Sequence, residues 1–173
     1  MKTDKEAWLK EYTEFVKSDG ATVPTEIFMS LKSRLFPNPW IVFGKILGIH
    51  SIVGFLSLGI CNQFGLNPFG TEHSLMNWFM RVGGHNFCML ACGIFFMTTT
   101  YLISNVMLGL EELETIRRYG WLQTGVLGLV SLAAFYFFGA DLVATFASLW
   151  ILGAFIGAFA AIEGSYRLRR QWA

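Results

Sequence analysis

The stretch "WLQTGVLGLVSLAAFYFFGADLVATFASLWILGAFIGAFAAI", residues 121–162, decides the fold class because it contains a single charged residue, Asp141. A helix needs about 20 apolar residues to cross the hydrocarbon core of a bilayer. This stretch is long enough for two such helices, and the short segment "FFGAD" interrupts it. We therefore expect an antiparallel pair of membrane-spanning helices here, at about 121–138 and 142–162.

Two further apolar segments, at about 40–61 and 87–110, have the length of membrane spans. The whole chain of 173 residues is 54% hydrophobic and only 14% charged, which is too apolar for a water-soluble domain of this size. The sequence therefore predicts an all-α, polytopic membrane protein with four transmembrane helices. We expect residues 1–38 to form a cytoplasmic helical head, 39–166 the transmembrane domain and 167–173 a cytoplasmic tail.

Lysine and arginine residues predict how the chain is oriented, because they are enriched in cytoplasmic loops. Six of them precede the first span, whereas the loop between the first two spans has only Arg81. Arg117 and Arg118 follow the second span, and three arginines follow the fourth. This alternation predicts a multi-pass membrane protein with an even number of spans and both termini in the cytoplasm. The net charge of +1 argues against direct binding of nucleic acid.

The segment before the first span contains two amphipathic helical patterns, one ending near Gly20 and one from about Pro24. Their apolar stripes, which are candidate partner-binding residues, are formed by Trp8, Leu9, Tyr12, Phe15, Val16, Ile27, Phe28, Leu31 and Leu35. Fewer than 40 residues cannot bury an independent core. The stripes must cover each other, lie on the membrane or bind a partner. The polar faces mix acidic residues with lysine, which favours a protein partner over a lipid surface.

The sequence "WLKEYTEFVKSDGATVPTEIFMSLKSRLFPNP", residues 8–39, followed directly by several spans, resembles bacterial membrane-bound anti-sigma factors. The resemblance covers about the first fifth of the chain and depends on this layout and on "VPTEIFMSL". It implies a role in signal transduction and transcription regulation. In that family a cytoplasmic helical segment holds a sigma factor, and the membrane part responds to a signal from outside.

A cluster of soft ligands is expected near the outer ends of the first two spans. His85, Cys88 and Cys92 have spacings that place them on one helical face, and Cys61 ends the first span at a similar level. The candidate metal ligands are Cys61, His73, His85, Cys88, Cys92 and His50. Thiolate and imidazole groups suit zinc or copper. The alternative is that these cysteines are small buried side chains that pack the helices.

Haem is disfavoured, because bis-histidine ligation needs two rings at matching depth. Helical rise places His50 about 15 Å deeper than His85. No nucleophile–base pair or phosphate-binding loop indicates an enzyme. Two glycine pairs, Gly44 with Gly48 and Gly153 with Gly157, predict close helix packing and leave oligomerisation open.

The function that fits best is a signalling regulator that releases its partner on a redox or metal signal from the envelope. The alternatives are a membrane redox, haem or metal-binding protein, and a non-catalytic accessory subunit of a membrane complex.

Overall fold

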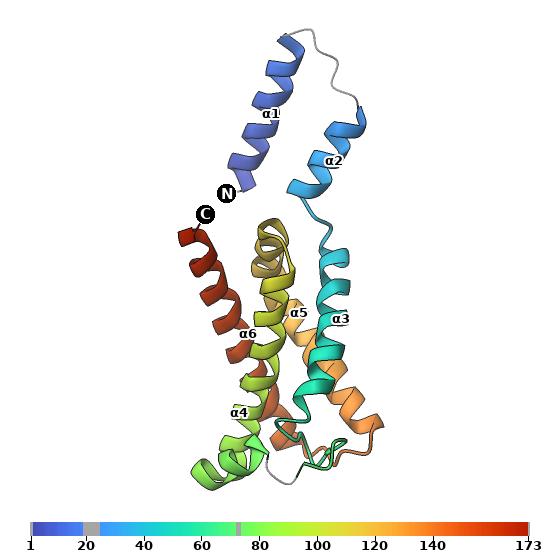
Figure 1. The fold of residues 1–173 in the computed structure, drawn as a ribbon, viewed down its shortest axis with the longest axis vertical. Helices are drawn as coiled ribbons and strands as arrows, with labels where there is room; N and C mark the ends of the chain where they lie inside the picture. The colour runs from blue at the N-terminus through green and yellow to red at the C-terminus, as the bar shows by residue number, and fades with distance from the viewer. Residues whose placement is uncertain (1, 19–24, 72–73, 173) are drawn as a thin grey trace. The chain divides into compact units, whose positions relative to one another are not determined.

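The computed structural model describes residues 2–18, 25–71 and 74–172, which form six α-helices and no β-strand (Figure 1). The chain divides into two compact units, Met1–Asn38 and Pro39–Ala173. Four of its helices are long and apolar enough to cross a membrane, and all four belong to the second unit. The predicted all-helical class and the number of candidate spans are therefore confirmed.

The first unit, which we call the head, contains helix α1, Lys2–Ser18, and helix α2, Thr25–Leu35. Lys32 and Arg34 lie in the last turn of α2, where positive charge interacts favourably with the helix dipole. The helix ends before Phe36 because Pro37 disfavours the helical conformation of the residue that precedes it. Pro24, expected in the first turn of this helix, is outside the described residues.

The second unit, which we call the membrane unit, contains α3 (Pro39–Ser57), α4 (Leu75–Met107), α5 (Leu110–Phe137) and α6 (Ala144–Trp172). Three of these helices extend beyond the spans expected from hydropathy. Helix α4 begins well before residue 87 and bends at Gly84, whose φ is 72°. Helix α5 begins before residue 121, and residues 167–172, expected as a tail, continue α6. Apolar length therefore located the spans but not the helix ends.

Helices α4 and α6 approach each other closely at three glycines. A Cβ atom added to Gly93, Gly153 or Gly157 would collide with a backbone carbonyl oxygen of the other helix. Small residues allow this approach in lipid, and the packing predicted for Gly153 and Gly157 is thus confirmed. The packing predicted for Gly44 and Gly48 is wrong within this chain, because a Cβ added at either position would meet nothing within 4 Å.

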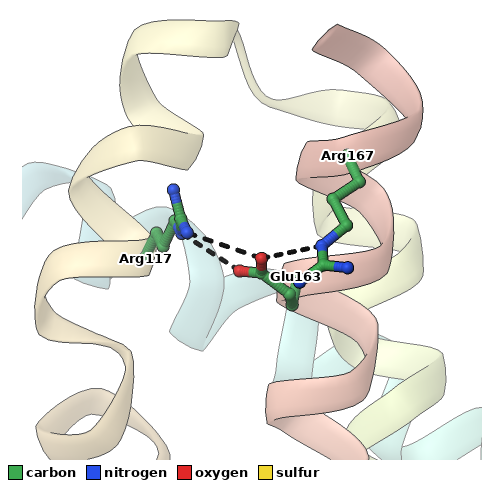
Figure 2. Close-up of polar contacts among 3 residues, drawn as sticks. All are labelled: Arg117, Glu163 and Arg167. Carbon is green, nitrogen blue, oxygen red and sulfur yellow. Dashed lines mark hydrogen bonds and ion pairs between the residues drawn. The ribbon is translucent and has the colours of Figure 1, made fainter. Parts of the chain in front are cut away.

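Ion pairs join the helices at the end of the membrane unit where α3 begins. Figure 2 shows Glu163 of α6 between Arg117 of α5 and Arg167 of its own helix, with shortest distances of 3.1 and 2.9 Å. Lys45 of α3 lies 2.5 Å from Glu112, which also accepts a hydrogen bond from the Gly109 backbone at the start of α5. Lys45 and Glu163, which are charged residues in apolar helices, are therefore paired at this end of the membrane unit.

Candidate functional site: the cysteine trio and the His50 cavity

The three cysteines of the chain meet at the opposite end of the membrane unit, and we call them the cysteine trio. Cys61 follows α3, and its backbone N–H donates to the Ser57 carbonyl at 2.9 Å. Cys88 and Cys92 are one turn apart on α4. The Cys92 sulfur lies 3.0 Å from that of Cys61 and 3.9 Å from that of Cys88. All three are buried free thiols, and Cys92 is the member shared by both contacts.

The trio is placed for thiol–disulfide chemistry. A disulfide has an S–S distance of about 2.05 Å, so Cys61 and Cys92 need a further approach of about 1 Å to form one. Cys88 also donates a weak hydrogen bond to the Met76 carbonyl, 3.7 Å away. Oxidation of Cys61 and Cys92 would link the end of α3 covalently to α4.

The histidines predicted as further ligands are not part of the trio. The His85 ring packs on Phe146 of α6, with ring centroids 4.1 Å apart. His50 is hydrogen bonded elsewhere, and His73 is outside the described residues. Among the described residues, no group of three or more His, Cys, Asp or Glu side chains has the arrangement of a metal site. A structural zinc site takes four ligands, and among the described residues the trio supplies three.

His50 is the centre of a buried polar network between three helices. Its Nδ1 lies 2.9 Å from Thr100 Oγ1 of α4, and its Nε2 lies 2.7 Å from Ser131 Oγ of α5. Phe96 packs edge-on against the ring, 5.2 Å from it. His50 and His85 have different neighbours, so the chain does not bring these two rings together as a haem-binding pair.

The network has more acceptors than a neutral imidazole can satisfy. The Thr100 hydroxyl donates to the Phe96 carbonyl and the Ser131 hydroxyl to the Leu127 carbonyl. Both hydroxyls can then only accept a hydrogen bond from the His50 ring. A neutral imidazole has one N–H donor, and its other nitrogen is an acceptor that needs a donor. One hydroxyl must therefore redirect its proton to His50, and this exchange leaves the network with two alternative arrangements.

A cavity of about 760 Å³ opens beside His50, and we call it the His50 cavity. Its walls come from α3, from α5 and from residues 65–68 of the loop after α3, and Phe96 of α4 closes one side. The sequence singled out His50 but not this cavity, which depends on α3 and α5 being neighbours. Ser131 and Thr100, polar residues inside apolar segments, were the available signal.

The loop after α3 is anchored in the bundle by Gln63, which sequence reasoning missed. Its side-chain oxygen accepts a 2.7 Å hydrogen bond from the indole N–H of Trp150 on α6, and both side chains are buried. Phe64 packs beside them against Phe135 and Trp150. These contacts hold the loop that follows Cys61 against α5 and α6.

The head presents apolar side chains that it does not bury. Trp8, Phe15 and Ile27 are 49%, 65% and 56% exposed, and Trp8 stacks on Tyr12 with ring centroids 5.6 Å apart. Leu9, Leu31 and Leu35, which complete the described part of the predicted stripes, are half-buried. The side chains of Val16 and Phe28 are outside the described part of the structure.

A groove of about 510 Å³ also lies within the head. It is lined by Glu6, Leu9, Lys10, Thr13, Lys32 and Phe36. Residues of opposite charge therefore border an apolar floor.

No family model, curated protein or solved structure matches this chain.

Proposed function

We propose that this protein is a membrane-embedded signalling regulator. In this proposal the head, residues 1–38, holds a cytoplasmic protein partner, and the membrane unit releases that partner in response to a redox signal from the envelope. Under this proposal the protein lies in the bacterial inner membrane, which the resemblance to anti-sigma factors implies, with both termini in the cytoplasm, which the distribution of lysine and arginine predicts. The sequence resemblance of the head to anti-sigma factors makes a sigma factor the proposed partner.

The exposed apolar surface of the head is the observation that carries this proposal. Trp8, Phe15 and Ile27 are each about half exposed or more in a unit of two helices. Large aromatic side chains are the residues most often found at the energetic centre of protein interfaces. Burying them against a partner removes apolar area from water, at about 25 cal/mol per Å².

The cysteine trio supports redox over metal as the proposed signal. Cys61 and Cys92 are close enough for a disulfide after a small movement, whereas neither described histidine joins them. The trio lies at one end of the membrane unit, and the head is joined to the start of α3 at the other. Cys61 follows α3, so a change at Cys61 would act on the far end of the helix whose beginning is joined to α2 of the head by residues 36–38.

Affinity capture of the full-length protein from its native membrane tests the proposal. We expect a sigma factor to be enriched with the wild type and with Glu14→Gln, a charge change on the opposite face of α1. The double variant Trp8→Asp, Phe15→Asp should lose it while remaining in the membrane fraction. Absence of any sigma factor from the wild-type capture, with the protein intact and membrane-inserted, contradicts the proposal.

A second candidate function is a membrane redox or metal-binding subunit. The three neighbouring free thiols of the trio favour it, because they can be oxidised or bind a metal without any role for the head. An absorption spectrum and elemental analysis of the purified protein distinguish it. A stoichiometric metal or chromophore supports this second function, and colourless, metal-free protein argues against it.

A further inference from the structure

We propose that the His50 cavity is a binding site for a membrane quinone, meaning a neutral planar ring with carbonyl oxygens and an apolar tail. This inference goes beyond the signalling role and does not depend on it, since no residue of the head takes part. It is carried by the volume, the lining and the hydrogen-bonding groups of the cavity.

The cavity has the size and the opening that such a ligand requires. Its volume of about 760 Å³ lies within the range of about 300–1,000 Å³ that is usual for small-molecule sites. Phe55, Val130 and Phe138 line it and are themselves exposed on the outer surface of the bundle. The mouth therefore lies on the outer surface of the bundle and extends to the largely exposed loop residues 65–68. A molecule dissolved in the bilayer can enter between α3 and α5 while its tail remains in lipid.

The lining selects against charged lipids. None of the residues that border the cavity is Asp, Glu, Lys or Arg. An anionic fatty acid or a phospholipid headgroup would be placed in this apolar space without a counter-charge, which is costly. A neutral ligand avoids that cost.

Aromatic side chains favour a planar ring in the cavity. Phe55, Phe96, Phe135 and Phe138 all border it, and they come from three different helices and the end of α5. Aromatic rings pack against a flat π-system in stacked or edge-on geometry. A branched or purely aliphatic occupant would gain only part of this contact.

His50 and Ser131 supply the polar contact for a carbonyl oxygen. Both border the cavity, and they are joined by the 2.7 Å contact between Nε2 and Oγ. With the ring proton on Nε2, His50 donates either to Ser131 or to an acceptor in the cavity. Thr100 then donates to Nδ1, and Ser131 keeps its bond to the Leu127 carbonyl. In the structure Nε2 faces Ser131 Oγ, so a quinone carbonyl would take the Nε2 proton in place of Ser131, and no hydroxyl proton would be left unpaired.

A matched pair of variants separates this cavity from the general lipid surface. Ala134 borders the cavity, whereas its neighbour Ala133 is exposed and does not. Ala134→Phe should fill the space, and Ala133→Phe should add the same volume on the lipid-facing surface. His50→Ala removes the ring donor and is a third variant.

The experiment uses the full-length protein in nanodiscs, an azido-benzoquinone with a decyl tail as the photoaffinity probe, and peptide mapping by mass spectrometry. We expect saturable labelling of α3 and α5 peptides that excess decylubiquinone displaces. Labelling should fall at least tenfold in Ala134→Phe and several-fold in His50→Ala, and should be unchanged in Ala133→Phe. Thermal melting shows that each variant is folded.

Two results overturn the inference. One is labelling that does not saturate, or that is equal in folded Ala134→Phe and Ala133→Phe. The other is native mass spectrometry that shows a phospholipid retained by the wild type and lost from Ala134→Phe, with no competition by decylubiquinone. Neither result bears on capture of a partner by the head, so the two proposals fail independently.

Discussion

The sulfur atoms of Cys61 and Cys92 lie 3.0 Å apart although 31 positions separate them in the chain. Cys61 reaches this place because the backbone turns after α3, where its N–H still bonds the Ser57 carbonyl. Gln63, hydrogen bonded to Trp150, then holds the following loop against the bundle. The pair is thus built by a local turn before Cys61 and a tertiary contact after it.

A mild thiol oxidant such as diamide should produce a disulfide between Cys61 and Cys92. Closing a loop of this length restricts the unfolded chain by about 3–4 kcal/mol before strain is subtracted, so oxidation should raise the melting temperature. Peptide mapping without reduction identifies the bond. Cys88→Ser should retain the crosslink and Cys92→Ser should abolish it. A predominant bond between Cys88 and Cys92 would show that the contact across the helices is not the reactive one.

Gly153 and Gly157 of α6 should not tolerate even a methyl group. In Gly153→Ala the new Cβ meets the Leu90 carbonyl oxygen, which belongs to a helix backbone and cannot rotate aside. Overpacking of this kind costs about 1–3 kcal/mol, so thermal unfolding in detergent should begin at a lower temperature. Gly48→Ala is the matched control, because nothing lies within 4 Å of its added Cβ. Equal melting temperatures for the two variants would contradict the close packing of α4 and α6.

Much of the fold was predictable from apolar length alone, because a bilayer imposes one dominant constraint on every span. The helix ends were not. Helix α5 begins at Leu110, within a charged segment that hydropathy does not count as part of a span. Glutamates in its first turn stabilise the helix there because negative charge interacts favourably with the helix dipole. The bend of α4 at Gly84 depends on a positive φ, and a hydropathy pattern contains no information about backbone angles.

The candidate site was predictable in part. Cys88 and Cys92 are four residues apart, which places them on one helical face whatever surrounds the helix. His85 is three residues before Cys88, and its ring reaches Phe146 of α6 instead of the trio. The His50 cavity was not predictable, because it requires α3 and α5 to be neighbours. The hydropathy pattern of each helix does not determine which helices pack side by side in a bundle.

Breaking the contact between Gln63 and Trp150 should destabilise the membrane unit. Gln63→Leu leaves a buried indole N–H without its acceptor, which costs about 1–3 kcal/mol. Trp150→Phe removes the donor instead. In a double-mutant cycle the two losses should be less than additive by about 1 kcal/mol, because each variant removes the same bond. Unfolding in denaturant, monitored by circular dichroism, measures all four proteins. Strict additivity would mean that the bond contributes nothing to stability.

Glu163→Gln should have only a small effect that depends on salt. The carboxylate, 38% exposed, pairs with Arg117 and Arg167, and ion pairs this exposed contribute little to stability because water and salt screen them. The loss of melting temperature relative to wild type should shrink between 50 mM and 500 mM NaCl because salt screens exposed charges. Asp141→Asn, at the other end of α6, controls for net charge. A loss of several kcal/mol that persists at high salt would place this carboxylate in a desolvated site.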